Sequence, residues 1–159
     1  METALNARDV MLTDVPVVTA EAPVADVIAV LESHDLGGMP VLDDEQKLVG
    51  MVTEYDIISK RGLTAGSIMS RGVITVQEMA PVGELIELMG LHGVRQLPVV
   101  HDGQLIGIVT RRELMRRYAR TIWVCERCGT QEPGLLRPLK CPNCGATTFR
   151  VKDGSGVGR

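Results

Sequence analysis

The chain has 159 residues, of which 45% are hydrophobic and only 3% aromatic. This composition is that of a globular protein whose core is filled by aliphatic side chains and methionine. So few aromatic residues disfavour a base-stacking nucleic-acid platform. The acidic N-terminus does not resemble a signal peptide, and no apolar run reaches the ~20 residues that cross a bilayer. We therefore expect a cytoplasmic protein with no membrane segment.

The formal net charge of −3 is distributed unevenly along the chain. Residues 1–110 carry 6 basic and 16 acidic side chains, whereas residues 111–159 carry 11 basic and 4 acidic side chains. An asymmetry of this kind indicates separate modules.

An internal repeat occupies most of the first 120 residues. Positions 58 apart match, as Pro40 and Pro98 do at the start of two similar segments, PVLDDEQKLVGMVTEYD and PVVHDGQLIGIVTRRE. After the turn inside these segments the offset falls to 57, because the second copy lacks one residue. We expect one repeat at 7–62 and another at 65–120, with a linker in the segment RGLTAGS.

Each copy predicts the element order β-α-β-β-α, which makes the protein α+β. A proline opens the first helix of each copy, and glycines end it. One copy alone has too little core, so we expect the two to associate through their sheets. The expected features are strands Val15–Thr19 and Val73–Gln77, helix starts at Pro23 and Pro81, helix ends at Gly37-Gly38 and Gly93, and apolar helix faces at 24, 27, 28, 31 and 82, 85, 86, 89.

The corner between the last strand and the last helix of each repeat has a recurrent polar pattern. Thr53 precedes Asp56 by three residues, and Thr110 precedes Glu113 by the same distance. This is the spacing of a capping box, in which threonine and the acid satisfy free backbone N–H groups. Helix capping is one interpretation of both pairs, and ligand binding is the other.

The order of these motifs, with PV at one strand start and hGhVTxxD at the end of the next strand, resembles the CBS (cystathionine-beta-synthase) family. The resemblance covers about 110 residues, in tandem. It implies a regulatory protein in which two repeats pair, often dimerise further, and hold an adenosine-type ligand such as AMP, ADP, ATP or S-adenosylmethionine. No catalytic constellation is evident, so we expect no enzyme activity.

The resemblance also implies two nucleotide sites, each closed by the facing repeat. Threonine would lie near phosphate, the acid would accept hydrogen bonds from ribose, and the residues before PV would line the cleft. The first site then has no charge before PV, whereas Arg95 adds a phosphate fork to the second. Glu113 is one methylene longer than Asp56, so we expect unequal binding. The candidate residues are Thr53, Asp56, Gly38 and Met39, with Gly37, in the first site, and Thr110, Glu113, Arg95, Gln96 and Arg112 in the second.

All four cysteines lie in the last third of the chain, as two C-x-x-C-G knuckles separated by twelve residues. Such spacing predicts a tetrahedral four-sulfur metal site rather than disulfides. The ligands would be Cys125, Cys128, Cys141 and Cys144.

Residues 121–151 resemble a zinc ribbon and also the rubredoxin-like domain of rubrerythrins. We favour structural Zn²⁺, with iron as the alternative at the same site. Trp123 and Phe149 are expected to form the small core beside the metal, and residues 152–159 to form a flexible tail.

Three arginines, Arg112, Arg116 and Arg120, share one face of the last repeat helix. A solvated helix face is one interpretation, and a patch for polyphosphate, nucleic acid or an acidic partner subunit is the other. We favour a regulatory nucleotide-binding homodimer with a ribbon that is structural or binds a partner protein. The alternatives are a nucleic-acid-binding transcriptional regulator and a rubredoxin-like electron carrier.

Overall fold

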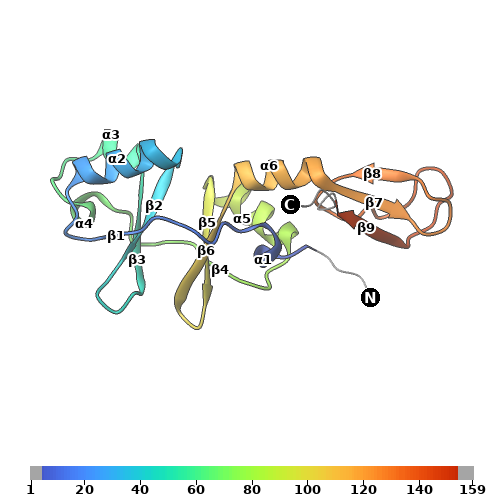
Figure 1. The fold of residues 1–159 in the computed structure, drawn as a ribbon, viewed down its shortest axis with the longest axis horizontal. Coiled ribbons are helices and arrows are strands. Elements are labelled where there is room, and N and C mark those ends of the chain that lie inside the picture. The colour runs from blue at the N-terminus through green and yellow to red at the C-terminus, as the bar shows by residue number, and fades with distance from the viewer. Residues whose placement is uncertain (1–4, 154–159) are drawn as a thin grey trace, which may run out of the picture.

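The computed structural model describes residues 5–153. Figure 1 shows three units side by side along the longest axis, in the order of the sequence: the first repeat, the second repeat and the cysteine-containing unit. None of the helices in the described part of the chain has the length and apolar character that a membrane span requires.

The first repeat consists of a small sheet with helices packed against it. Its elements are β1 (Val18–Thr19), α2 (Val24–His34), β2 (Gly38–Leu42), β3 (Leu48–Thr53) and α3 (Glu54–Ser59). The strand order is β1-β2-β3, with β1 parallel and β3 antiparallel to β2. Strand β1 is shorter than predicted, because only two of its residues pair with β2.

The second repeat has the same order and strand directions, which confirms the predicted duplication and the α+β class. Its elements are β4 (Val76–Gln77), α5 (Val82–His92), β5 (Gln96–His101), β6 (Gln104–Thr110) and α6 (Arg111–Arg120). Helix α6 is longer than its counterpart α3 and continues toward the C-terminal unit (Figure 1).

The ends of the first helix in each repeat differ from each other. Helix α5 ends at Gly93, as predicted, and this residue adopts a left-handed conformation with φ 63°. Helix α2 ends instead at Asp35, with φ 51°. The predicted stop at Gly37-Gly38 is therefore wrong, because Asp35 supplies the left-handed residue and Gly38 already begins β2.

Two one-turn helices, α1 (Ala7–Val10) and α4 (Ala65–Ile68), were not predicted. The segment RGLTAGS is thus only partly a linker, since α4 begins inside it with Thr64 as its N-cap. Each of these helices packs on the repeat to which it does not belong by homology. The backbone N–H of Ala7 donates to Ala80 O at 2.8 Å, and that of Ala65 donates to Ala22 O at 2.8 Å.

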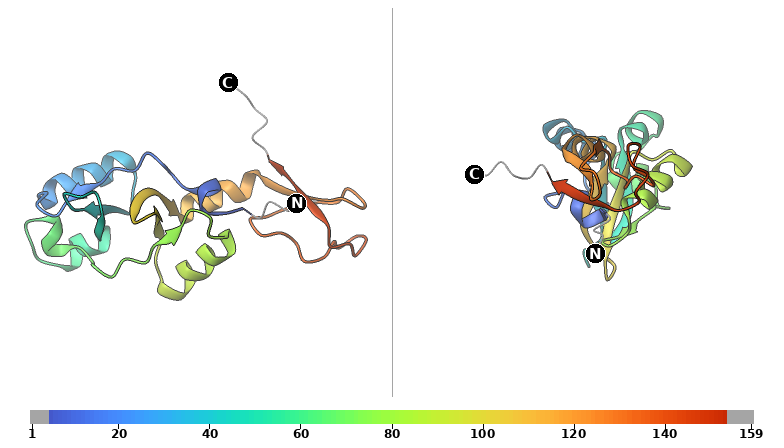
Figure 2. Two further views of the ribbon diagram at one scale, coloured as in Figure 1. Left: turned by 90° about the horizontal axis from the view of Figure 1, so that it is seen from below. Right: turned by 90° about the vertical axis from the view of Figure 1, so that its right-hand side faces the viewer.

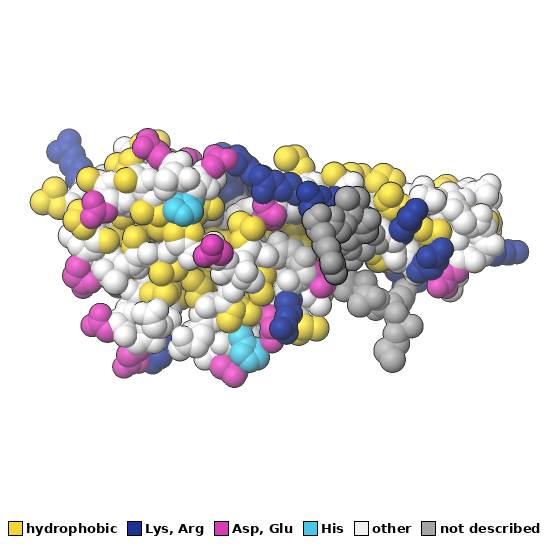
Figure 3. All heavy atoms as spheres, viewed as in Figure 1, with side chains coloured by type: hydrophobic (Ala, Val, Ile, Leu, Met, Phe, Trp, Pro, Cys, Tyr) yellow, Lys and Arg dark blue, Asp and Glu magenta, His cyan; other side chains and the backbone are white. Residues whose placement is uncertain are grey.

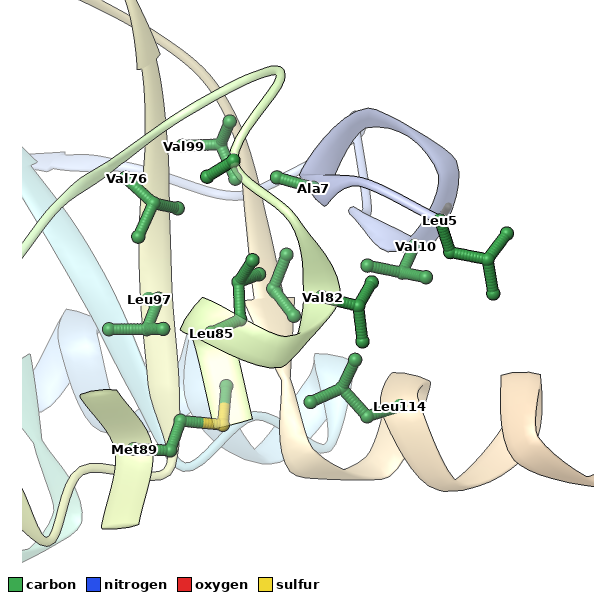
Figure 4. Close-up of a cluster of buried hydrophobic side chains, with 12 residues drawn as sticks. Leu5, Ala7, Val10, Val76, Val82, Leu85, Met89, Leu97, Val99 and Leu114 are labelled. Carbon is green, nitrogen blue, oxygen red and sulfur yellow. The ribbon is translucent and has the colours of Figure 1, made fainter. Parts of the chain in front are cut away.

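This exchange of segments completes both hydrophobic cores. Figure 4 shows side chains of the N-terminal segment beside those of α5, β5 and α6. In the first repeat, Ala65 and Ile68 of α4 lie in the core formed by α2, β2 and β3. The core of the second repeat contains Leu5, Ala7, Val10, Val76, Ala80, Val82, Leu85, Met89, Leu97, Val99, Val109 and Leu114.

Equivalent positions of the two repeats meet at the junction between the sheets. Lys47 bridges Gln104, its counterpart at an offset of 57. Gly38 faces Gln96, its counterpart at an offset of 58, so closely that a Cβ on Gly38 would lie 2.2 Å from Gln96 Nε2. Contacts between equivalent residues indicate that a twofold axis relates the repeats, and a side chain at Gly38 would have to displace Gln96.

The C-terminal unit is a three-stranded antiparallel sheet of β7 (Thr121–Cys125), β8 (Gln131–Pro133) and β9 (Phe149–Asp153), in the order β8-β7-β9. Strand β7 follows α6 with no residue between them, and Figure 2 shows the unit extending away from the first repeat. Leu135 packs against the core of the second repeat. Residues 152 and 153 belong to β9 rather than to the expected tail, whose remainder, 154–159, lies outside the described residues.

Candidate functional site: two clefts and a four-cysteine cluster

The first cleft, of about 550 Å³, lies between the Thr53 corner and the second repeat. Thr53 and Asp56 line it from the start of α3, and Arg95 lines it from the opposite repeat. The facing repeat thus closes the site, as predicted. Its apolar wall includes Met51, Tyr55, Ile58, Val73, Ile74, Val94 and Pro98.

Asp56 is only 3% exposed and has four hydrogen-bonding or ionic partners. Its Oδ2 accepts hydrogen bonds from the backbone N–H and the hydroxyl of Thr53, both at 2.8 Å. Its Oδ1 accepts a bond from Ser70 Oγ at 3.0 Å and lies 2.7 Å from Lys60 Nζ. The predicted capping box is present, since Thr53 Oγ1 also accepts from the Asp56 backbone N–H at 3.2 Å.

These contacts favour the ionised form of the Asp56 carboxyl. Burial raises the pKa of its carboxyl, but the Lys60 ion pair and the hydrogen bonds from Thr53 and Ser70 outweigh burial and lower the pKa below the usual 3.8. A carboxylate has about four lone-pair sites, and this structure fills all of them. A ribose hydroxyl would therefore have to replace one of these partners.

The second cleft, of about 390 Å³, lies at the Thr110 corner. Thr110 caps α6 by accepting a bond from the Glu113 backbone N–H at 3.1 Å, as predicted. The Glu113 carboxylate forms an ion pair with Arg116 rather than the reciprocal bond that Asp56 makes. Arg112 pairs across the cleft with Asp35 of the first repeat.

Arg95 and Gln96 line both clefts, and so do Gly37 and Glu54. The expectation that the first site has no nearby arginine is therefore wrong. The reason is the twofold relation, which places the residues before PV at the junction of the two clefts. Within residues 5–153, no carboxylate forms an ion pair with Arg95.

Two other predicted site residues do not line either cleft. Met39 is fully buried in the core of the first repeat. Gly38 is buried beneath the Gln96 side chain and serves the junction between the repeats.

The sequence prediction missed Ser70, Val73 and Ile74 in the first cleft, together with Lys60 behind Asp56. Three of them come from the segment after α4, which follows an exchanged helix. A comparison of the two copies gives no signal for this exchange. The two sequences would match equally well whether each short helix packed on its own repeat or on the other one.

The four cysteines form a compact cluster whose sulfur atoms all lie within 4.8 Å of one another. The pairs Cys125–Cys144 and Cys128–Cys141 have Sγ–Sγ distances of 3.6 Å. A tetrahedral zinc site with Zn–S bonds of about 2.3 Å has sulfur atoms about 3.8 Å apart. The cluster can thus hold a metal ion.

Both knuckles have the same backbone geometry. Gly129 donates to Cys125 O and Gly145 donates to Cys141 O, both at 2.9 Å. These glycines have φ values of 77° and 73°, a left-handed conformation that glycine adopts readily. Trp123 and Phe149 pack with Cys125 and Cys141 in one buried cluster, as predicted, and Trp123 Nε1 donates to Gly134 O at 2.9 Å.

The thiols themselves favour a cation between them. A hydrogen bond from the Thr130 side chain, aided by its backbone, lowers the pKa of Cys128 to about 6. The Ala146 backbone lowers the pKa of Cys144, but burial and the three other cysteines outweigh it and raise the pKa to about 12. Four thiolates this close repel one another unless a metal ion neutralises them.

The arginines of α6 form a basic band, shown in dark blue along that helix in Figure 3. Acidic side chains are more numerous on the first repeat in the same view. Arg112 and Arg116 are already paired with Asp35 and Glu113. Much of this predicted stripe therefore serves contacts within the chain.

The CBS domain family model matches residues 7–62 and 65–120, the two repeats predicted from the sequence. Inosine-5'-monophosphate dehydrogenase of Methanocaldococcus jannaschii is 35% identical over 115 residues, covering 70% of this chain but only 23% of the dehydrogenase. Hypoxic response protein 1 of Mycobacterium tuberculosis is 32% identical over 119 residues, covering 70% of this chain and 83% of that protein.

Solved structures of CBS-domain proteins share the fold. CBSX2 in complex with AMP has a TM-score of 0.66 and 29% identity, covering 70% of this chain and 93% of that one. The CBS domain pair of protein MJ0100, bound to 5'-methylthioadenosine and S-adenosyl-L-methionine, has a TM-score of 0.65 and 29% identity, covering 73% of this chain and 97% of that one. Hypoxic Response Protein I carries two coordinated zinc ions, with a TM-score of 0.63 and 29% identity, covering 70% of this chain and 98% of that one. The family model ends before the four cysteines, so they are an addition to the matched repeats. With both repeats matched over more than half of its length, this chain belongs to the CBS domain family.

Proposed function

We propose that the protein is a regulatory module that binds an adenosine-type nucleotide, AMP in the first instance, in its first cleft. The observation that carries this proposal is the composition of that cleft. An apolar wall that includes Val73, Ile74 and Val94 suits a purine ring, while Thr53 and Arg95 offer polar contacts to the sugar and phosphate. The cleft volume of about 550 Å³ is in the range of small-molecule sites.

The ligands of similar proteins support the same class of molecule. CBSX2 was solved with AMP, and the MJ0100 domain pair with 5'-methylthioadenosine and S-adenosyl-L-methionine. All three molecules contain adenosine. We infer that ligand binding shifts the packing between the two repeats and that this shift, rather than catalysis, is the output.

Asp56 has a different role in this proposal from the one its motif suggests. Its carboxylate is already bound by Thr53, Lys60 and Ser70, so it holds the cleft in shape. Ser70 is the partner that a ribose hydroxyl can replace most easily, because its own hydroxyl can rotate toward solvent or ligand.

Calorimetric titration of the dialysed, metal-loaded chain with AMP, ADP, ATP, NAD and S-adenosylmethionine tests the proposal. We expect binding of at least one of these. The Val73→Trp substitution should fill the first cleft and abolish the response. The matched control is Val15→Trp, at the equivalent position of the first repeat, because Val15 lines neither cleft. No binding by any of the five ligands would refute the proposal.

We further propose that the cysteine cluster holds structural Zn²⁺. The spacing of its sulfur atoms suits that ion. A unit of about 30 residues has a small hydrophobic core and needs a bound metal to stabilise its fold. Cysteines stay reduced, and can bind metal, in a reducing compartment. The proposed zinc site therefore agrees with a location in the cytoplasm. Native mass spectrometry of protein from its own cells should show one zinc per chain. An iron-bound, coloured protein would instead favour electron transfer.

A homodimer is the oligomer we propose. Two helix faces, one on each repeat, expose equivalent apolar side chains: Ile58, 82% exposed, on α3, and Met115, 68% exposed, on α6. The rim of the first face is acidic and that of the second is basic, which favours a second copy as the partner. Sedimentation should show a dimer that Ile58→Asp dissociates, whereas Met79→Asp, at an exposed site outside the helices, leaves it intact.

A further inference from the structure

Arg95 has no arginine counterpart at the equivalent position of the first repeat. It lines both clefts, together with Gly37, Glu54 and Gln96. The internal repeat pairs Arg95 with Gly37, so the first repeat has no guanidinium at the corresponding position. At this position the two clefts related by a twofold axis therefore share one arginine instead of having one each.

The other cations near the clefts are already engaged. Arg112 pairs with Asp35, Arg116 with Glu113, and Lys60 with Asp56. Arg111 Nη2 donates to Met89 O at 3.5 Å. In the described range 5–153, Arg95 is thus the cleft arginine whose side chain has no protein partner.

A guanidinium binds phosphate through paired, directed hydrogen bonds. Arg95 has five N–H donors, but a phosphate in each cleft would bring two anions to one guanidinium, and its single positive charge cannot neutralise both. We propose that Arg95 limits each chain to one tightly bound phosphate-bearing nucleoside, because the two clefts compete for it. This inference rests on the proposed nucleotide function and adds stoichiometry and specificity to it.

The structure also shows how to remove the limit. A Cβ at Gly37 would meet nothing closer than Glu54 Oε2 at 3.9 Å, and Gly37 does not have a left-handed φ. Gly37→Arg would therefore give the first repeat the arginine that the second already has. The neighbouring Gly38 offers no such room, because Gln96 fills it.

Isothermal titration of the full, zinc-loaded chain with AMP and with adenosine tests this. The wild type should bind one AMP per chain, with a second at least about tenfold weaker. Arg95→Gln should weaken the tight AMP site by about tenfold or more and change adenosine binding by less than about twofold. Gly37→Arg should raise the number of tight AMP sites from one to two.

The outcomes separate this inference from the function on which it rests. Two equal AMP sites in the wild type, or one unchanged tight site in Gly37→Arg, would overturn the shared arginine while leaving nucleotide binding intact. Equal loss of AMP and adenosine binding in Arg95→Gln would also overturn it, because the role would then not depend on phosphate. Absence of binding by both ligands would overturn the proposed function itself.

Discussion

The strand-to-helix corners of the two repeats have the same plan and different outcomes. In each, threonine caps a helix and an acid follows three residues later. The Asp56 carboxylate turns back to Thr53 and also holds Lys60 and Ser70. The Glu113 carboxylate extends outward to Arg116. One extra methylene thus distinguishes Glu113, in an ion pair at the surface, from Asp56, whose buried carboxylate is held by several polar contacts.

This difference shows that matching a motif does not identify its function. The aspartate that best fits the family pattern is occupied by contacts within the chain. The asymmetry that bears on ligands lies instead at the junction of the repeats, where Gly37 and Gly38 face Arg95 and Gln96.

Removal of the metal ion proposed for the cysteine cluster should have the largest effect, and on one side of the molecule only. The cysteine unit is attached to the second repeat through α6 and Leu135. Because metal binding to such units contributes on the order of 10 kcal/mol to their folding, a chelator should unfold this unit and spare the first repeat.

Trp123 makes this outcome easy to measure. It is the only tryptophan in the chain and is 2% exposed. Its fluorescence should shift to the red on chelation, while far-ultraviolet circular dichroism retains the helical signal of the repeats. Unchanged emission after verified metal loss would show that the unit folds without metal.

Asp56→Ala should cost about 3 kcal/mol of unfolding free energy, because it leaves the half-buried Thr53 N–H and the Lys60 amine without the Asp56 carboxylate. The matched substitution Glu113→Ala should cost less than about 1 kcal/mol, since it removes an exposed ion pair. Urea denaturation of both variants measures the difference. Equal costs would mean that the two corners are energetically alike.

Acid should weaken the same contacts, because it protonates the Asp56 carboxylate. The pKa of Asp56 is lower in the folded state than its usual 3.8. Its charge therefore contributes stability that is fully present above that value and is lost as the pH falls through the folded-state pKa. The urea midpoint of the wild type should fall between pH 5 and 2 more steeply than that of Asp56→Asn. Parallel curves would contradict this assignment.

The smallest effect is expected from making the corners alike. Glu113→Asp shortens the acid so that it can close the capping box at Thr110, a gain of about 0.5 kcal/mol. The reverse substitution, Asp56→Glu, should destabilise by more, because the longer side chain does not fit among Thr53, Ser70 and Lys60. A thermal midpoint that falls in Glu113→Asp would show that the Arg116 pair matters more than the cap.

The local features of the fold could be predicted because they depend on local chemistry. Apolar spacing, prolines and the threonine caps predicted the positions of the long elements. The two C-x-x-C-G knuckles predicted the four-cysteine cluster. The short helices α1 and α4 could not be found in this way. One turn has too few residues to show a period, and its stability comes from packing on the other repeat.

The candidate site was only partly predictable for a related reason. The repeat identified the corner residues, but it could not show that Arg95 would serve both clefts. That placement depends on the axis between the repeats. The repeat also could not show that Ser70 would contact the Asp56 carboxylate, because this contact follows from the exchange of α4. The Lys60 contact is local, since Lys60 lies four residues after Asp56.

The exchanged segments have a consequence for how the chain is made. Met69 is the last residue in the core of the first repeat, so that half can fold while the rest is still being synthesised. The N-terminal segment, however, must wait for the second repeat to emerge before Ala7 can bind Ala80. In a protein with a single repeat the same contact could form only with another copy, so the exchange within this chain has the geometry of a domain-swapped dimer.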